Sequence, residues 1–475
     1  MTLAGAGRQD RPALLSAISG EVLRYRDLEA RGRELCAPLG RAKELLMLFC
    51  RNDAFTVAAY TGAVGAGHAV ALLDGQGAPQ LGADLVTAYR PAWLAGPPGV
   101  AERLGTCGVP VQAVMPVDGG ELVRTEYRSP GGLHPDLSVL LATSGTTGSR
   151  RFVRLSGQSV GANAESIARY LGLTPDERPI TSLPLHYSFG LSVLNSHLLA
   201  GAAVVLTGDS VMQKLFWETF RAHGCTSLAG VPFTYQMLER IGFRDMDLPT
   251  LTTLQQAGGA LDLRLTRVYA EHMARRGGRF FVMYGQTEAT ARIAYVPPES
   301  LLDKLGSAGI AIPGGRLRID ADGSASPAAW STGEVVYKGP NVMLGYASDP
   351  EDLLRGDELH GVLRTGDIGY LDEDGFLFLV GRSKRIAKVF GLRVNLDEVE
   401  LALRENGPAA VVGGPDAIVA FCAFGTDKSL ADLARALARR YRLHPSALQF
   451  RRVEAIPTTE SGKIDYGQVQ AWTTS

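Results

Sequence analysis

The sequence predicts an α/β protein with more than one domain. Its 475 residues exceed what a single hydrophobic core usually serves, so two or more domains are expected. Up to Arg292, short apolar runs of strand type alternate with helical patterns, which is typical of parallel α/β architecture. After Arg292, short β-rich pieces separated by turn signals predict a small β-subdomain.

The first part of the chain carries the strand–helix alternation. A helix is expected over residues 25–35, an apolar strand over 45–49, a buried helix over 55–66 and a strand over 69–73. The further expected elements are strands at 138–143, 180–183, 202–206, 253–257 and 280–283, and a helix at 158–171. This order favours parallel-rich sheets with flanking helices.

After Arg292 the sequence pattern changes from strand–helix alternation to short strands separated by turns. Its expected strands lie at 317–319, 334–337, 369–371 and 376–380. Turn signals such as Asp374-Gly375 separate them. The strand-rich pattern ends near residues 381–384. The remaining chain is expected to contain a strand at 418–424 and a helix at 430–441. The expected domains are therefore residues 1–382 and 383–475.

Composition narrows the class of protein. The chain is 45% hydrophobic with a net charge of −1, which fits a globular core and argues against nucleic-acid binding. The five cysteines are scattered and form no Cys-x-x-Cys pair, so neither disulfides nor a zinc site is expected. Residues 1–11 do not resemble a signal peptide, and no apolar run reaches about 18 residues. We therefore expect a cytoplasmic protein without a membrane span.

A loop of glycine and hydroxyl residues follows the apolar run Val139-Leu140-Leu141-Ala142. It consists of Thr143, Ser144, Gly145, Thr146, Thr147, Gly148 and Ser149. Glycine lets backbone N–H groups approach an anion closely and hydroxyls add donors, so the composition suits a polyphosphate. The Walker A pattern is absent, and a plain surface loop is the alternative.

A second polar segment, Tyr284-Gly285-Gln286-Thr287-Glu288, follows the expected strand at 280–283. Ligands of open α/β sheets bind at such strand ends. The aromatic ring can stack on a base, the threonine hydroxyl can reach a phosphate, and the carboxylate can hold Mg²⁺. A turn with a satisfied tyrosine is the alternative.

Two further segments offer charge to a nucleotide. Asp367 follows an expected tight turn in Arg364-Thr365-Gly366-Asp367, and its carboxylate can accept hydrogen bonds from ribose hydroxyls, with Arg382 as a cation nearby. Lys463 stands in a glycine-containing loop, where its ammonium can neutralise a carboxylate and a phosphate together. Solvated surface side chains are the alternative for both segments.

Read together, these segments resemble the AMP-forming acyl-adenylate superfamily, which comprises acyl-CoA synthetases, adenylation domains and firefly luciferase. The resemblance runs from about residue 12 to residue 470 and rests on motif order and approximate spacing. The matching motifs are residues 144–148, 284–288, 332–334 and 364–370, Gly381-Arg382, Lys388 with Gly391, and Gly462-Lys463. The chain is most similar to a freestanding acyl- or aryl-CoA ligase.

The resemblance implies a fold and a set of ligands. A large N-terminal domain of parallel-rich sheets with flanking helices and a small β-subdomain would carry most of the site. A small mobile α+β C-terminal domain would close over it. The implied ligands are ATP, Mg²⁺, a small carboxylic acid and CoA or a carrier protein. The implied reaction forms an acyl adenylate, releases pyrophosphate and passes the acyl group to a second nucleophile.

The resemblance also implies residue roles at the phosphates. Residues 143–148 would hold the β- and γ-phosphates of ATP, with Arg151 at the end of the loop. Thr287 would contact the α-phosphate, and Glu288 would ligate Mg²⁺ together with Thr147. Lys463 would bind the substrate carboxylate and the α-phosphate in the first step.

Further roles concern the nucleoside and the second step. Tyr284 would stack on adenine, and Asp367, helped by Arg382, would hold the ribose. The other nucleotide-site residues implied are Gly258, Gly259, Ala260, Gly285, Gln286, Lys388 and Gly391. For the second step, the C-terminal domain would rotate about Lys384, withdrawing Lys463 and bringing the Gly391 loop to the site.

Some features depart from the family pattern. The phosphate loop ends Gly148-Ser149-Arg150-Arg151 where the family usually has Gly-x-Pro-Lys, so Arg151 keeps the cation but changes its shape. The C-terminal domain is rather short. No carrier domain is expected, because only 12 residues follow Lys463.

The substrate is expected to lack an α-amino group. Amino-acid-activating members often carry an Asp in a Phe-Asp-x-Ser stretch, and the matching stretch here, Pro184-Leu185-His186-Tyr187-Ser188-Phe189-Gly190, has no acid. His186 is either a gate beside the carboxylate or a satisfied buried histidine. The pocket candidates are His186, Tyr187, Phe189, Gly190, Val231, Pro232, Gly258, Gly259 and Met283. They suggest a pocket for an aryl or short-to-medium acyl acid.

Several alternatives remain open. The acyl acceptor is CoA, a separate carrier protein's phosphopantetheine, or a non-thiol nucleophile such as an amine. A luciferase-like oxidative enzyme and a non-catalytic nucleotide binder are the other classes. A basic cluster near the C-terminus (Arg439, Arg440, Arg442, Arg451 and Arg452) is either a solvated face or a site for CoA phosphates or an acidic carrier.

Overall fold

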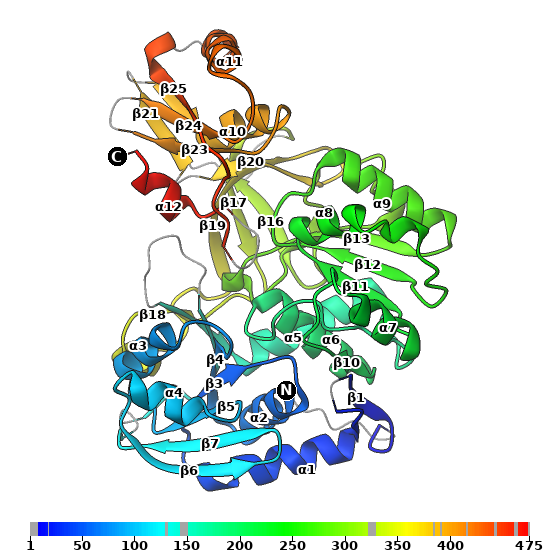
Figure 1. The fold of residues 1–475 in the computed structure, drawn as a ribbon, viewed down its shortest axis with the longest axis vertical. Coiled ribbons are helices and arrows are strands. Elements are labelled where there is room, and N and C mark those ends of the chain that lie inside the picture. Colours follow the sequence, from blue (N-terminus) through cyan, green and yellow to red (C-terminus); the bar gives the residue numbers. More distant parts are fainter. Residues whose placement is uncertain are drawn as a thin grey trace. The chain divides into compact units, whose positions relative to one another are not determined.

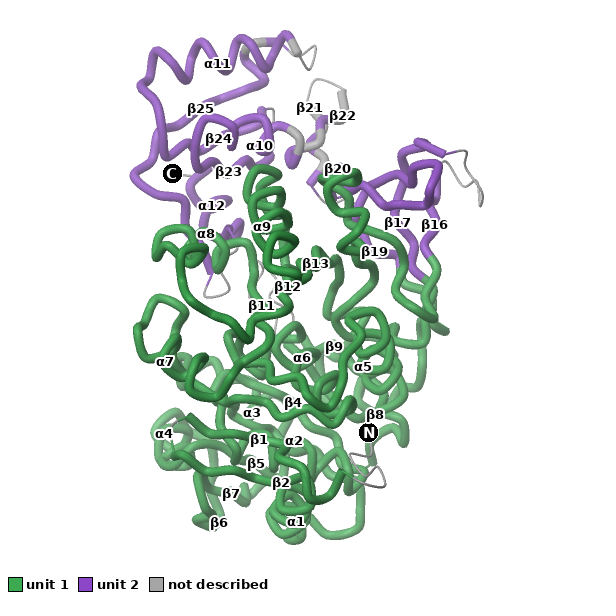
Figure 2. Tube along the Cα trace, turned by 90° about the vertical axis from the view of Figure 1, so that its right-hand side faces the viewer, with its two compact units in different colours: residues 1–144, 150–316, 338–363 green, residues 145–149, 317–337, 364–475 purple. Residues whose placement is uncertain are grey.

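The computed structural model describes most of the chain. The described residues are 8–17, 19–128, 132–142, 151–321, 329–382, 385–389, 392–414, 417–440, 444–459 and 464–473. They form two compact units, coloured separately in Figure 2. Unit 1 comprises residues 1–144, 150–316 and 338–363, and unit 2 comprises residues 145–149, 317–337 and 364–475.

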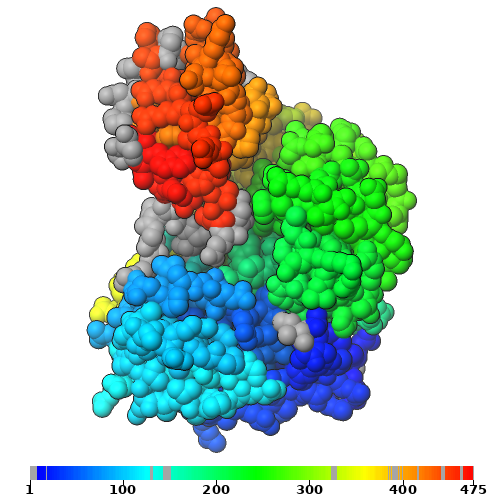
Figure 3. All heavy atoms as spheres, viewed as in Figure 1, coloured from blue at the N-terminus to red at the C-terminus, as the bar shows by residue number. Residues whose placement is uncertain are grey.

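The largest sheet of unit 1 has eight strands (Figure 1). In spatial order they are β18 (Gly345–Ala347), β9 (Phe152–Ser156), β8 (Leu137–Ala142), β4 (Ala69–Asp74), β3 (Leu45–Cys50), β5 (Trp93–Gly96), β7 (Gly120–Thr125) and β6 (Val111–Val117). The four central strands β8, β4, β3 and β5 are parallel, and antiparallel strands flank them. β6 is partly exposed at the sheet edge, within the cyan surface of Figure 3.

The central strands are covered on both faces. All six residues of β3 are buried. Leu46 and Leu48 pack into one core with α1 (Tyr25–Cys36) and α2 (Ala54–Gly65), whereas Leu45 and Met47 pack into another with α3 (Pro79–Tyr89) and α4 (Val100–Thr106). Because side chains alternate along a strand, a strand buried on both faces reads as a continuous apolar run.

Helices α1 and α2 approach closely at two glycines. A Cβ on Gly32 would lie 2.9 Å from the Ala58 carbonyl oxygen, and one on Gly62 would lie 2.3 Å from the Gly32 carbonyl oxygen. Larger side chains would force the helices apart. The Asp53 carboxylate caps α2 by accepting a hydrogen bond from Thr56 N at 2.8 Å, which satisfies one free amide of the first turn.

A second sheet of unit 1 positions the candidate site. Its strands, in order, are β11 (Ser227–Gly230), β12 (Thr253–Gln256), β13 (Arg279–Tyr284), β14 (Ala294–Val296) and β15 (Ile310–Ala311). The first three are parallel. The remaining strands of unit 1 form a small sheet in the order β10 (Val204–Leu206), β1 (Pro12–Ser16) and β2 (Val22–Arg24). The remaining α-helices are α5 (Gly157–Leu171), α6 (Ser188–Ala200), α7 (Lys214–Ala222), α8 (Pro232–Arg240) and α9 (Leu263–Arg275).

Unit 2 is an α+β assembly. Its four-stranded sheet has the order β16 (Arg316–Asp320), β17 (Gly333–Lys338), β19 (Val362–Leu371) and β20 (Leu377–Arg382). The rest comprises the pair β21 (Ile386–Val389) and β22 (Leu392–Asn395), the sheet of β23 (Ala409–Gly413), β24 (Ile418–Cys422) and β25 (Leu448–Arg452), and helices α10 (Leu396–Arg404), α11 (Asp427–Arg440) and α12 (Tyr466–Ala471).

Most expected elements are present, and two expectations are wrong. Residues 180–183 form no strand: Pro179 and Ile180 make only isolated bridges to Ser227 and Val205, because the chain turns at Pro184 soon after. Asp367 does not follow a tight turn but lies inside β19, where Gly366 takes a φ of +71° within an otherwise extended strand. The expected domain boundary after Arg382 stays a prediction.

No helix of the described residues is both long enough and apolar enough to cross a lipid bilayer.

Candidate functional site

Three parallel strands of unit 1 end at a common edge. The register aligns Gly230 of β11 with Gln256 of β12, and Gln256 with Val282 of β13. The loops that leave these strands begin at Val231, Ala257 and Gly285, so predicted site segments far apart in sequence start side by side. The carboxyl edge of parallel strands is the usual ligand-binding edge of an open α/β sheet.

Two glycines in these loops are sterically required. Gly258 has a φ of +86°, and a Cβ there would lie 2.8 Å from the Tyr187 hydroxyl. A Cβ on Gly285 would lie 1.8 Å from the Ala291 carbonyl oxygen. Any side chain at either position would therefore displace its neighbours. Gln286 Nε2 donates to the Tyr284 hydroxyl at 3.4 Å, so the predicted adenine residue is linked to the same loop.

Thr287 and Glu288 begin a short 3-10 helix, Thr287–Ala289, directly after this loop. The Thr287 hydroxyl donates to Ser188 Oγ at 3.2 Å, which ties it to the start of α6. Glu288 Oε1 accepts a hydrogen bond from the Tyr346 hydroxyl at 2.9 Å. The Glu288 carbonyl accepts from Met343 N at 2.9 Å, so both its backbone and its side chain are held by the segment that leads into β18.

Arg151, the described residue of the changed loop end, stacks on an aromatic ring. Its guanidinium carbon lies 3.4 Å from the centroid of the Tyr346 ring, in cation–π geometry. Burial raises the pKa of Tyr346 well above its ordinary value, and the nearby Glu288 carboxylate adds to this, while Arg151 lowers it. The hydroxyl therefore stays protonated near neutral pH and can donate to Glu288. Arg151, Tyr346 and Glu288 form a chain of contacts that we call the Arg151 platform.

His186 lies in a turn just before α6. Tyr187 N donates to the Pro184 carbonyl at 3.1 Å, and His186 is half-buried between them. The backbone of this turn approaches the helix closely at Gly190, where a Cβ would lie 2.2 Å from the Pro184 carbonyl oxygen. Burial raises the pKa of the Tyr187 hydroxyl, so it is a neutral donor at physiological pH.

Four predicted pocket residues belong to one apolar cluster. This cluster, which we call the pocket-wall cluster, contains Ile167, Leu171, Leu183, Phe189, Val193, Ala229, Val231, Ala257, Phe281 and Met283, with Tyr170, Leu173, Tyr187 and Tyr295 packed against it. The predicted residues are Phe189, Val231 and Met283, which are members, and Tyr187, which packs against them. They come from α6, from the turn before it and from the edge where β11 and β13 end.

Unit 2 contributes a second, separate group. Asp367 on β19 pairs in register with Arg382 on β20, and Arg382 Nε donates to Asp367 Oδ1 at 2.9 Å. The Asp367 side chain is 5% exposed and that of Arg382 is 64% exposed, so the carboxylate is held in place while the cation reaches solvent. Asp367 N also donates to Thr365 Oγ1 at 3.1 Å.

The sequence matches the family described as AMP-binding enzyme over residues 3–347. The chain belongs to this family. A 2-succinylbenzoate–CoA ligase of Bacillus velezensis is 30% identical over 341 residues, covering 69% of this chain and 67% of that protein. A luciferin 4-monooxygenase of Luciola mingrelica is 28% identical over 347 residues, covering 69% of this chain and 62% of that protein. This AMP-binding enzyme thus matches only about two thirds of these relatives' lengths.

The fold likeness extends over nearly the whole chain. The structure of o-succinylbenzoate CoA synthetase from Bacillus subtilis with ATP and a magnesium ion superposes with a TM-score of 0.75 at 23% identity. The superposition covers 97% of each chain. The expected α/β fold with a large N-terminal and a small C-terminal part is thereby confirmed, whereas the superfamily is confirmed by the family match over residues 3–347.

Several predicted residues of this AMP-binding enzyme fall outside the described residues. They are Thr143, Ser144, Gly145, Thr146, Thr147, Gly148, Lys384, Gly391 and Lys463. Lys388 lies on β21 opposite Arg393, and its side chain is not described. Among the described residues, no group of three or more His, Cys, Asp or Glu side chains is arranged to hold a metal ion.

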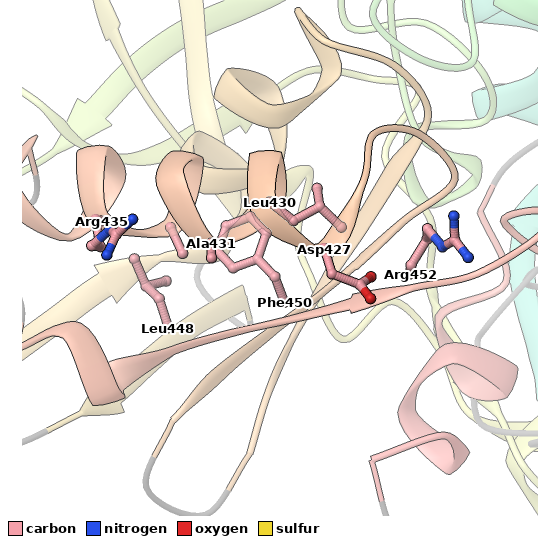
Figure 4. A pocket seen from close by; sticks show the side chains of 8 residues that line it. Asp427, Leu430, Ala431, Arg435, Leu448, Phe450 and Arg452 are labelled. Carbon is pink, nitrogen blue, oxygen red and sulfur yellow. The ribbon is translucent and has the colours of Figure 1, made fainter.

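A shallow hollow of about 350 Å³ lies within unit 2 between α11 and β25. Its lining residues are Asp427, Leu430, Ala431, Ala434, Arg435, Leu448, Phe450 and Arg452. Figure 4 shows Phe450 beneath α11, with Arg435 and Arg452 toward opposite ends. Arg452 of the predicted basic cluster lines this hollow, whereas Arg442 lies outside the described residues.

Sequence reasoning missed three residues of this region. Tyr346 lies 58 residues from Glu288, and Ser188 lies 99 residues from Thr287, so no local pattern connects either pair. The third residue, Arg292, directly precedes the apolar stretch Ile293-Ala294-Tyr295-Val296. An arginine beside a buried strand is a signal that could have been noticed.

Proposed function

We propose that the protein is a carboxylic acid ligase that forms an acyl adenylate from ATP, releases pyrophosphate and then transfers the acyl group to CoA. The names of its relatives support adenylate-forming CoA ligation as the general chemistry. The observation that carries the proposal is the position of Thr287 and Glu288 at the carboxyl edge of three parallel strands. Ser188 accepts a hydrogen bond from the Thr287 hydroxyl, and the Tyr346 hydroxyl donates to the Glu288 carboxylate.

The residues at this edge fit a magnesium nucleotide. Glu288 offers a hard oxygen ligand, and Mg²⁺ is commonly bound by one or two carboxylates together with substrate phosphates. One Glu288 oxygen accepts from Tyr346, which orients the other. When bound, Mg²⁺ would neutralise phosphate charge. We assign Thr147 to the same ion and residues 143–148 with Arg151 to the β- and γ-phosphates.

We assign the nucleoside to the residues that the family resemblance implies. Tyr284 stacks on adenine, with the Gly258-Gly259-Ala260 loop, Gly285 and Gln286 around it. Asp367 accepts hydrogen bonds from the ribose hydroxyls, and Arg382 fixes the orientation of its carboxylate. A carboxylate that is buried and already held loses little side-chain entropy on binding, which favours its use as a ribose ligand.

The first step joins two anions. A carboxylate oxygen of the acid attacks the α-phosphorus, and pyrophosphate leaves with the electron pair of the broken P–O bond. Thr287 donates to an α-phosphate oxygen, and Lys463 neutralises the incoming carboxylate. Positioning and charge neutralisation are what such a reaction requires, because the reactants otherwise repel each other.

The second step exchanges the adenylate for a thioester. The thiol of CoA attacks the acyl carbon and AMP leaves. We place His186 beside the reacting carboxylate as a gate, since its turn adjoins Ser188 and therefore Thr287. We assign Lys388 and Gly391 to this step, after rotation of the C-terminal domain about Lys384, with the domain boundary at residues 382 and 383 and a cytoplasmic location.

The test is product analysis over a panel of acids with and without CoA. Acid-dependent pyrophosphate release, together with an acyl-CoA seen by mass spectrometry only when CoA is present, is the expected result. Hydroxylamine in place of CoA should give a hydroxamate. Pyrophosphate release without any acyl-CoA would contradict the assigned acceptor, and oxygen consumption or light emission would point to oxidative chemistry instead.

A further inference from the structure

Arg292 is a buried cation of the candidate site that has no carboxylate partner among the described residues. It is 1% exposed and is among the largest fully buried side chains of the protein. Its Nη2 atom is buried without a hydrogen-bond partner among the described residues. Its other polar contacts are with neutral groups: Nε lies 3.4 Å from Met283 Sδ, Nη1 lies 3.5 Å from the Ala291 carbonyl oxygen, and the side chain also hydrogen-bonds to Tyr170. A neutral thioether, carbonyl or hydroxyl does not neutralise the charge as a carboxylate would.

The other fully buried arginine shows what such a side chain normally requires. Arg154 is completely buried, and its Nη2 lies 2.6 Å from Glu358 Oε2. Its Nε donates to the Tyr346 carbonyl at 3.0 Å, and its Nη1 donates to the carbonyls of Arg355 and Gly356. Burying a guanidinium is costly unless its charge and its donors are satisfied in this way. Among the described residues, Arg292 has no carboxylate partner, and its Nη2 has no acceptor.

The neighbours of Arg292 place it at the predicted acyl pocket. Its guanidinium carbon lies 4.0 Å from the centroid of the Phe189 ring, and its Nε contacts Met283, so two members of the pocket-wall cluster touch it. The charge also acts on Tyr170 and Tyr187, because Arg292 lowers the pKa of both hydroxyls against the stronger effect of burial. An otherwise apolar wall therefore contains one full positive charge.

The surroundings contain further unsatisfied polar atoms. Asn163 Nδ2 donates to the Arg292 carbonyl at 3.4 Å, while Asn163 Oδ1 and Ser166 Oγ on the same helix, α5, are buried and have no hydrogen-bond partner in the described part of the chain. The Met283 side chain has three rotatable bonds and can move to admit a ligand atom beside Nε and Nη2. A guanidinium presents two parallel N–H groups that match a carboxylate.

We propose that the acid substrate carries a second carboxylate and that Arg292 binds it. This inference rests on the proposed function, because the pocket is assigned by that function. The first carboxylate reacts near Thr287, and the second pairs with the Arg292 fork at the pocket wall. A purely apolar acid would leave the buried charge unpaired, whereas a dicarboxylic acid neutralises it. Arg292 is thus a specificity-determining residue for a dicarboxylate.

The first test compares dicarboxylic acids of graded length, aliphatic and aromatic, with their half-amides, which keep the shape and remove the second charge. For the best diacid, the wild-type kcat/KM for pyrophosphate release should exceed that of its half-amide by about 30-fold or more, since losing one partner of a buried charge pair is costly. In Arg292→Gln the two should become equal within a few fold. A neutral monocarboxylic acid that outperforms every diacid would overturn the inference.

A second test does not need catalysis. Calorimetric titration should show diacid binding to the wild type that weakens by a similar factor in Arg292→Gln. Diacid binding that depends on Arg292 without pyrophosphate release would leave this inference standing and refute the proposed function. Acid-dependent pyrophosphate release with no preference for a second carboxylate would do the reverse. Diacid binding that ignores Arg292 would overturn the inference.

The thermal stability of two arginine variants tests whether Arg292 has a structural role. Replacing an unpaired buried charge by a hydrophobic residue removes a penalty, whereas replacing a paired one breaks contacts and leaves its partner alone. Arg292→Met should therefore keep or raise the Tm of the ligand-free protein, and Arg154→Met should lower it. An Arg292→Met variant that loses as much Tm as Arg154→Met would show that Arg292 is a structural arginine and not a binding one.

Discussion

The Arg151 platform predicts a specific defect in magnesium use. In Tyr346→Phe, the ring under Arg151 is kept and only the hydroxyl that donates to Glu288 at 2.9 Å is removed. A hydrogen bond to a charged acceptor is worth about 1.5–3 kcal/mol. Loss of a group that orients a metal ligand typically costs about 10- to 100-fold in metal affinity or activity. We expect the Mg²⁺ concentration for half-maximal rate to rise by about that factor, with a smaller change at saturating Mg²⁺.

The assay measures acid-dependent pyrophosphate release against free Mg²⁺ at a fixed ATP concentration. Binding of Mn²⁺ with a non-hydrolysable ATP analogue, followed by EPR, gives a readout independent of turnover. Tyr89→Phe is the matched control, because the Tyr89 hydroxyl donates to the Ala347 carbonyl at 2.7 Å, one residue beyond Tyr346. The control should lose some stability and keep its metal dependence. Identical Mg²⁺ curves for Tyr346→Phe and the wild type would refute the role of the platform.

Three further predictions concern other parts of the chain. Lys463→Ala should cripple adenylation but spare thioester formation from a supplied acyl adenylate; an equal loss of both half-reactions, measured separately, would contradict the two-step assignment. Asp367→Asn should raise the KM for ATP by about tenfold or more, because hydrogen bonds to a charged acceptor are lost, and should shrink the discrimination against deoxy-ATP; unchanged nucleotide discrimination would speak against a ribose contact. Burial lowers the pKa of His197 to about 4. As the pH falls, His197 is therefore protonated near pH 6.5 in the unfolded chain but only near pH 4 in the native protein. The unfolding free energy should therefore fall by up to about 3 kcal/mol between pH 6.5 and 4, and His197→Gln should flatten that slope in urea titrations; an unchanged slope would mean that another group controls it.

The regular parts of the fold were predictable because they follow from local periodicity. Apolar runs such as residues 45–49 and 69–73 form buried central strands, and the helix expected at 25–35 is α1. The strand expected at 180–183 does not form: the segment is short, its two middle residues are polar, and it makes only isolated bridges before the turn at Pro184. The turn expected at Gly366 is absent, because β19 continues past this residue and pairs with β20 although Gly366 has a φ of +71°. The local sequence does not show this pairing.

The candidate site was predictable only where motif residues are contiguous. Thr287 and Glu288 stand together in the sequence, so their joint place at a strand end could be anticipated. The side chains that hold them, Ser188 and Tyr346, belong to distant segments and are found only once the chain is folded. The lack of a carboxylate partner for Arg292 among the described residues is likewise a property of the packed core and not of any motif.

The central claim is that ATP and an acid meet at the Thr287–Glu288 edge to form an adenylate. The most direct measurement is exchange of labelled pyrophosphate into ATP, without CoA, over a panel that includes monocarboxylic and dicarboxylic acids. We expect exchange that requires both acid and Mg²⁺ and that is strongly reduced in Glu288→Gln. Exchange that persists in Glu288→Gln, or no exchange with any acid despite measurable ATP binding, would contradict it.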